Sequence, residues 1–235
     1  MALAVLCLAS PAFGQEVTLT LGEDGSLATR SIQLLALVTI LSLVPGIAIM
    51  VTCFPFIVTV LAILRQAIGL QQSPPNMLMI SLALFLTYFV MEPVFVESWT
   101  SGIRPMMDGA IALEDGFIRA MDPLREFMSA RVDGDTLSEL ASLRPDLAPG
   151  LAPMNAPLSV LVPSFLLSEI EHAFQVGFMI FLPFLIIDLV VAAVLMSMGM
   201  MMVPPAIVSL PFKLAFFVVA DGWALIAASL VRGYS

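Results

Sequence analysis

The sequence predicts an all-α, membrane-associated protein made of helical hairpins, with four long, kinked hydrophobic helices and a small acidic helical insert. Hydrophobic residues make up 60% of its 235 residues and charged residues only 11%, against roughly 45–50% and 25% in soluble domains. An acidic segment lies between apolar runs that are long enough to cross a bilayer. The net charge of −9 excludes a nucleic-acid-binding protein, because phosphate binding needs an excess of Lys and Arg.

Residues 1–14 are typical of a cleaved signal peptide. The apolar run Ala2–Ala9 is too short to cross a hydrocarbon core of about 30 Å, and Ala12 and Gly14 fit a signal-peptidase site. Cleavage would remove Cys7 and leave Cys53 alone, so no disulfide is expected. The small Cys and His inventory predicts no metal site, and we expect no cofactor.

Residues 31–91 predict a first helical hairpin. Ile32–Leu64 is 33 residues without a charge, and its prolines predict a bent or broken helix. The polar segment Gln71–Asn76 forms a turn. A second apolar helix then runs to Met91, and we expect Glu92–Pro93 to end it.

Residues 92–157 predict an acidic insert that ends in a proline-rich linker. Of the 27 charged residues in the chain, 16 lie between Glu92 and Asp146, and eleven of these are acidic. Helical spacing of apolar residues predicts amphipathic helices over 117–128 and 137–143. We interpret the insert as a solvated region outside the cytoplasm, with no catalytic pair of carboxylates.

Residues 158–235 predict a second hairpin. Its first helix is expected to kink at Pro183. Gly199 with Pro204 and Pro205 then turns the chain into a last helix. The turn itself is rich in methionine.

Three isolated charges interrupt the apolar helices of this second hairpin. Asp188 lies on its first helix, and Lys213 and Asp221 lie on its last helix; residues 173–231 contain no other charge. A charge at the bilayer centre costs at least about 2.5–3.5 kcal/mol. These helices are therefore expected to face protein, which predicts an oligomer.

Lys213 is the only lysine and needs a counter-ion. Asp221 is eight residues away, about 12 Å along one helix, and thus too far. Asp188 could approach across the hairpin, whereas Glu169 could reach Lys213 only from another subunit. Alternatively, the ammonium group extends to a membrane interface.

The segment Met200, Met201 and Met202 allows two interpretations. Methionine is flexible and fills irregular gaps in a packed helix end. However, these residues lie at a turn, where polar residues are usual. Symmetric copies could bring several methionines together as a deformable ring.

Long, ordered strings of the sequence resemble the FliP family of flagellar type III export-gate proteins. The resemblance covers nearly everything from Ser31 onward. Its strings are 64–67, 71–72, 74–76, 84–87, 90–91, 93–94, 123–128, 173–178, 181–184, 187–191, 198–202, 204–205, 210–213 and 221–223.

This resemblance implies a pore-forming subunit that passes unfolded flagellar proteins. It implies a homo-oligomer of several copies, pentamer-like, with FliQ-like and FliR-like subunits and other export-apparatus membrane proteins. The location implied is the bacterial inner membrane and flagellar basal body, extending to the periplasmic side. Met200–Met202 match the pore gasket, and Glu169 and Lys213 match an inter-subunit ion pair, with Asp188, Asp221, Pro204 and Pro205 in structural or assembly roles.

The sequence leaves three alternative functions. One is the related gate of an injectisome. A second, of a different class, is a proton-coupled secondary transporter in which Asp188 and Asp221 relay protons. An intramembrane hydrolase is the third, but His172 has no evident nucleophile partner, and no enzyme is expected.

Overall fold

The computed structural model describes residues 27–70, 73–147, 150–200 and 202–234. Regular structure within these ranges is helical, which confirms the predicted all-α class. By internal packing the chain divides into two compact units, residues 1–44 and 45–235. The predicted signal peptide over residues 1–14 lies outside the described residues.

The predicted broken helix over residues 32–64 is two helices, α1 (Leu27–Met50) and α2 (Phe54–Ile68). Pro45 lies inside α1 and does not end it. The break falls just before α2, whose first turn contains Pro55. Proline is well tolerated there because a first-turn N–H has no helical partner to lose.

The prediction that Glu92–Pro93 ends the second apolar helix is wrong. Helix α3 (Asn76–Ser98) runs through Pro93 and leads directly into η1 (Trp99–Ile103), which is π-helical, and α4 (Arg104–Met107). Proline removes one backbone hydrogen bond from a helix interior. The packing of α3 against α2 and α5 holds the helix together despite this loss.

The acidic insert contains the two predicted amphipathic helices, α5 (Leu113–Arg131) and α6 (Gly134–Ser142), followed by the short 3₁₀-helix η2 (Pro153–Asn155). Asp133 caps α6 by accepting a hydrogen bond from the Thr136 amide at 2.9 Å. The helices share a small apolar core with the start of the next helix, including Met128, Leu137, Leu161 and Phe165.

Helix α7 (Leu158–Ser197) is 40 residues long, which corresponds to about 60 Å. Pro163 and Pro183 both lie within it, so the helix continues through both prolines, and the kink expected at Pro183 stays a prediction. This single helix carries both Glu169 and Asp188.

The expected single last helix is instead two helices, α8 (Pro205–Val219) and α9 (Gly222–Arg232), bent by 62°. Asp221 lies between them in the left-handed region with φ of 50°. Aspartate is one of the few non-glycine residues that adopt this conformation readily. After this bend α9 packs against α3 and α8.

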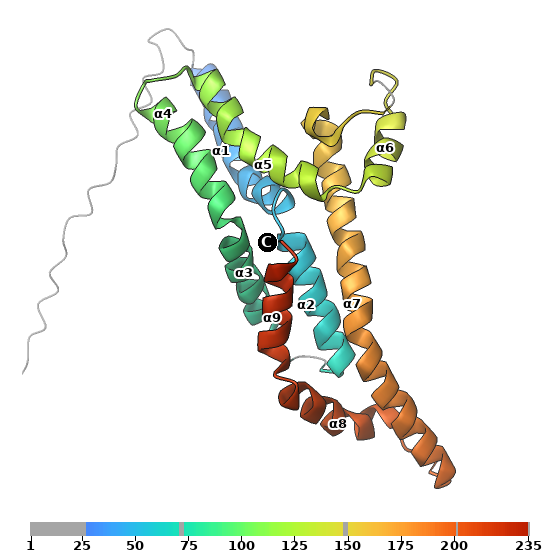
Figure 1. The fold of residues 1–235 in the computed structure, drawn as a ribbon. Helices are drawn as coiled ribbons and strands as arrows, with labels where there is room; N and C mark the ends of the chain where they lie inside the picture. Colours follow the sequence, from blue (N-terminus) through green and yellow to red (C-terminus); the bar gives the residue numbers. More distant parts are fainter. Residues whose placement is uncertain (1–26, 71–72, 148–149, 201, 235) are drawn as a thin grey trace, which may run out of the picture. The chain divides into compact units, whose positions relative to one another are not determined.

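Helix α2 is central in the unit formed by residues 45–235. It packs against α7 along its length and against α3 and α8, and α9 lies beside α3 (Figure 1). Its buried residues, among them Ile57, Val60, Leu61 and Leu64, form the middle of the main core. In Figure 1, α5 passes from the α3–η1 side to α7 and so ties the insert to both.

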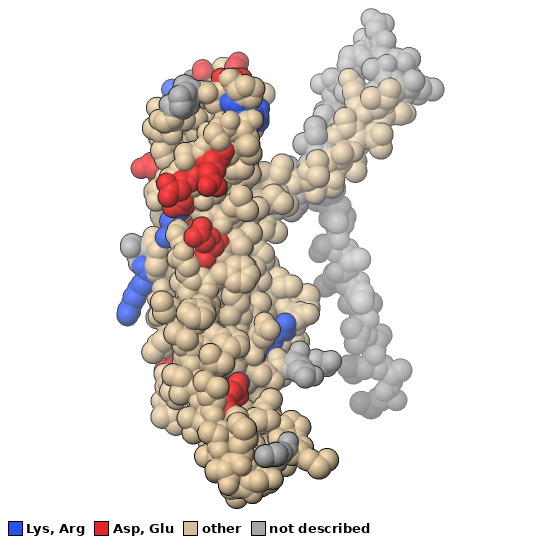
Figure 2. Space-filling model, turned by 90° about the vertical axis from the view of Figure 1, so that its right-hand side faces the viewer, with Lys and Arg blue, Asp and Glu red and all other residues tan. Residues whose placement is uncertain are grey.

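Three helical stretches among the described residues are long and apolar enough to cross a membrane: Ser31–Met50, Asn76–Met107 and Leu158–Ser197. The bent pair α8–α9 makes a fourth if it is counted as one span. In the Leu158–Ser197 stretch only 11% of the most apolar window is buried inside the chain. Charged side chains gather at the level of α4–α6 on the face drawn in Figure 2, and the opposite end is mainly uncharged.

Candidate functional site: a methionine-rich turn and two buried ion pairs

The methionine-rich segment forms the turn between α7 and α8. Gly199 has φ of +75°, a conformation that glycine adopts without steric cost. Met200 is 41% exposed and Met202 is 97% exposed; Met201 lies outside the described residues. The turn therefore presents large, flexible apolar side chains outward. These side chains are not packed inside the chain.

Two prolines end this turn. Pro204 is the residue before α8, with extended backbone, and Pro205 is the first residue of α8. A proline at the first helical position has a favourable fixed φ and lacks only an N–H that would be unpaired. The pair thus fixes where α8 begins, as the sequence predicted.

Lys213 is buried and joins three helices. Its Nζ lies 2.7 Å from Asp188 Oδ2 on α7 and donates to the Ala67 carbonyl on α2 at 3.0 Å. Ser209 donates to the other oxygen of Asp188 at 2.6 Å. Of the three partners considered for Lys213, the structure selects Asp188 within the chain.

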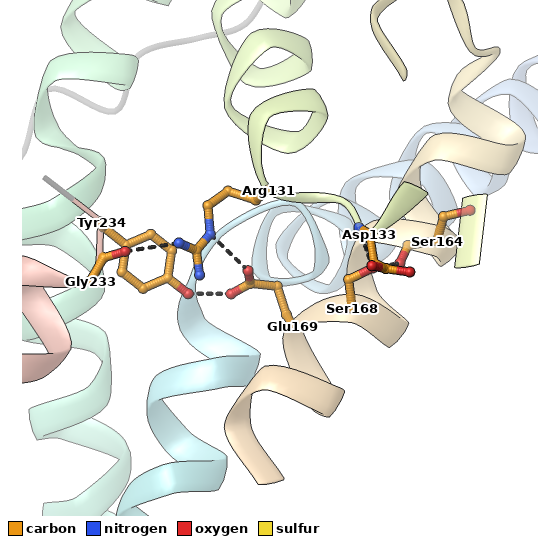
Figure 3. Close-up of polar contacts among 7 residues, drawn as sticks. All are labelled: Arg131, Asp133, Ser164, Ser168, Glu169, Gly233 and Tyr234. Carbon is orange, nitrogen blue, oxygen red and sulfur yellow. Dashed lines mark hydrogen bonds and ion pairs between the residues drawn. The ribbon is translucent and has the colours of Figure 1, made fainter. Parts of the chain in front are cut away.

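Glu169 forms the second buried ion pair. Its side chain is fully buried, and Arg131 Nε at the end of α5 lies 3.2 Å from its Oε1. The Tyr234 hydroxyl donates to Oε2. Figure 3 shows these three side chains converging between α5, α7 and the segment after α9.

A neighbouring set of hydrogen bonds fastens the α5–α6 turn to α7. The Asp133 amide donates to Ser168 Oγ at 2.9 Å, and Ser168 donates to the Ser164 carbonyl at 2.8 Å (Figure 3). The Thr136 amide and hydroxyl hydrogen bonds lower the pKa of the Asp133 carboxyl. The carboxylate form, which caps α6, is thereby favoured.

The structure keeps Glu169 and Lys213 apart within one chain. Asp188, which contacts Lys213, follows Glu169 by 19 residues on α7, about 28 Å along the axis. A pair between Glu169 and Lys213 can therefore only join two chains, and it stays a prediction. Each of the two residues is buried and has an intrachain partner with which such a pair would compete.

Asp221 lies at an exposed bend, eight residues after Lys213. Asp188, by contrast, is held by Lys213 and Ser209. The two carboxylates considered for a proton relay thus occupy different environments, one engaged in an ion pair and one at the surface.

The side chains of the two ion-pair clusters that the sequence does not predict as partners are Arg131, Tyr234 and Ser209. Ser209 precedes Lys213 by four residues on α8, so the i, i+4 spacing could have placed both on one helix face. No local signal distinguishes Arg131 from the other charges of the insert. Its partner is 38 residues away in sequence, and Tyr234 is 65 residues from Glu169.

Comparison with known proteins gives the family of the chain. The family model described as "FliP family" matches residues 37–230. This range includes the helices that form the two ion pairs and the methionine-rich turn. The chain belongs to the FliP family. FliP proteins are membrane-associated components of the flagellum and are not enzymes. Family membership therefore excludes the intramembrane hydrolase alternative.

Curated FliP proteins are similar to the chain over most of their length. The protein of Caulobacter vibrioides is 50% identical over 98% of this chain and 88% of its own length. The protein of Rhizobium meliloti is 47% identical over 90% of this chain and 86% of its own length. The protein of Bacillus subtilis is 44% identical over 90% of this chain and 96% of its own length. All three are named flagellar biosynthetic protein FliP.

Proposed function

We propose that the chain is a pore-forming subunit of the flagellar type III protein export gate, through which unfolded flagellar proteins pass. The observation that carries this proposal is the exposed methionine-rich turn at the end of a long apolar hairpin in a FliP-family chain. Several copies, with FliQ-like and FliR-like subunits, would surround a channel. The flagellar names of the relatives favour this system over an injectisome.

The proposed mechanism is a passive conduit closed by side chains. Methionine has an unbranched, flexible side chain that adapts to irregular surfaces. A ring of such side chains from several copies would exclude water from a narrow channel and yield to a passing polypeptide, because hydrophobic constrictions close by dewetting. The helices α7 and α8 supply the rigid support on either side of the turn.

The exposed apolar surface of the chain supports assembly in a membrane setting. Large apolar side chains on α7 and α8, including Leu189, Val190, Ile207 and Phe212, are exposed in the single chain. Contiguous apolar surface of this kind marks contacts with lipid or with other proteins. We place these helices against sister and partner subunits at the inner membrane, with the acidic insert on the periplasmic side.

Replacing Met200, Met201 and Met202 together by alanine is expected to raise ion leakage through the assembled gate and to leave assembly intact. Alanine removes most of the side-chain volume that fills the channel. Ion conductance of the complex in planar bilayers measures the effect. Met77→Ala with Met107→Ala is the matched control, because both methionines are exposed but lie outside the turn. Unchanged conductance in the triple variant would contradict the gasket role.

Charge reversal tests the proposed inter-subunit pair against the intrachain pair. Lys213→Glu is expected to impair assembly, and Glu169→Lys in the same chain is expected to restore it partly if the two residues meet between subunits. The comparison is Asp188→Lys combined with Lys213→Glu, because this double variant restores only the pair seen within the chain. The amount of assembled complex recovered on size-exclusion chromatography measures assembly in each of the two double variants. Restoration by Asp188→Lys alone would argue against the inter-subunit pair.

A further inference from the structure

We infer that Tyr234 and Arg131 form a clasp that holds the segment after α9 against α5 and α7 and keeps the Glu169 carboxylate inside the subunit. The clasp is defined by Arg131, Glu169, Gly233 and Tyr234, which Figure 3 shows together. Its members come from three parts of the chain that are distant in sequence.

The polar contacts of the clasp form a closed set. Arg131 reaches Glu169 through Nε at 3.2 Å and donates through Nη1 to the Gly233 carbonyl at 2.8 Å. Its guanidinium carbon lies 4.1 Å from the centre of the Tyr234 ring. The Tyr234 hydroxyl completes the set by donating to the second oxygen of Glu169.

Aromatic contacts fix the ring of Tyr234 in the same place. The ring meets Phe56 of α2 edge-on at 5.5 Å between centroids and stacks on Phe127 of α5 at 6.0 Å. Burial and the negative charge of Glu169 raise the pKa of the Tyr234 hydroxyl above its ordinary value. The hydroxyl therefore remains a hydrogen-bond donor throughout the physiological pH range.

The clasp is expected to open as a unit. Glu169 is fully buried, and a buried carboxylate that loses its partners is strongly disfavoured. Loss of either Arg131 or Tyr234 therefore favours an opened state in which Glu169 reaches water. We expect opening to expose Cys53 as well, because Cys53 is fully buried in the apolar cluster against which Tyr234 packs.

This arrangement has a consequence for assembly that, unlike the clasp itself, rests on the proposed inter-subunit pair. While the clasp is closed, Glu169 has both carboxylate oxygens engaged within its own chain. A subunit would have to open its clasp before Glu169 could pair with Lys213 of a neighbour. The clasp would then determine when a subunit becomes competent to join.

Alkylation of Cys53 by N-ethylmaleimide measures clasp opening in the purified full-length chain in detergent. A Cys7→Ser background leaves Cys53 as the only thiol. Tyr234→Phe keeps the ring and removes only the hydroxyl. Because a hydrogen bond to a charged group is lost, the alkylation rate is expected to rise by about 10- to 100-fold. Glu169→Gln, which removes the charge that holds Arg131, is expected to raise the rate as well.

Tyr88→Phe is the matched control, because Tyr88 is the only other tyrosine and is 60% exposed on α3. It should leave the rate of Cys53 alkylation unchanged. Amide hydrogen exchange in α8 shows whether the effect is local, and this exchange should not change in Tyr234→Phe. An unchanged alkylation rate in Tyr234→Phe would overturn the clasp. An equal acceleration of exchange in α8 would overturn it too, because it would reveal global destabilisation in place of local opening.

Discussion

Replacing Lys213 with methionine is expected to lower the free energy of unfolding by about 3 kcal/mol. Removing one partner of a buried ion pair typically costs about 3–5 kcal/mol, because the remaining charge is left without compensation. The lower end applies here because the Asp188 side chain is 31% exposed and water can partly solvate it. The Ala67 carbonyl at the end of α2 also loses its donor.

Equilibrium unfolding in mild detergent measures this change. The double variant Lys213→Met with Asp188→Leu should recover much of the loss, since a buried ion pair can be replaced by apolar residues at little net cost. Arg104→Met is the matched control, because Arg104 pairs with Asp108 at 3.9 Å on the surface and exposed pairs contribute little. A double variant as unstable as Lys213→Met would show that the unpaired charge is not the cause.

Gly102→Ala is expected to destabilise the junction between η1 and α5 by about 1–3 kcal/mol or more. A Cβ at this position would lie 2.4 Å from the Ala120 amide nitrogen and 2.6 Å from the Gly116 carbonyl oxygen. Both are backbone atoms of α5, so no side chain can rotate away to make room. The two segments would have to separate, and the insert would lose part of its attachment to α3.

Gly134→Ala is the control for this substitution. Gly134 is the first residue of α6 and nothing lies within 4 Å of a Cβ built there. Alanine should therefore leave stability unchanged or raise it slightly, because glycine is the more flexible residue in the unfolded chain. Unfolding midpoints and hydrogen exchange in α5 compare the two variants. Equal stability of both would contradict the close backbone approach at Gly102.

Much of the candidate site could be predicted from local sequence. The methionine-rich turn follows from Gly199 and the two prolines, and its exposure in the single chain agrees with an outward-facing role. Asp188 was one of three partners considered for Lys213, and the two helices that carry them bring them together. These features depend on one hairpin, in which neighbouring segments of sequence meet.

The remaining partners depend on distant segments. Arg131, Glu169 and Tyr234 lie at the end of α5, on α7 and after α9, and the aromatic neighbours of Tyr234 come from α2 (Phe56) and from α5 (Phe127). Periodicity reports which face of a helix is apolar, but it does not report which helix covers that face. The clasp therefore depends on how the helices pack, which local sequence patterns do not report.

The sequence by itself determined the all-α class, the apolar spans on either side of an acidic insert, and the turn between α7 and α8. Local composition and periodicity decide these features, because each depends on a few consecutive residues and on whether their side chains can leave water. Only the tertiary structure decided that α3 and α7 continue through their prolines, that α8 and α9 separate at Asp221, and that Glu169 is held by Arg131 and Tyr234. Those outcomes depend on packing between distant segments, whose contacts outweigh the local preference of a single proline or charge.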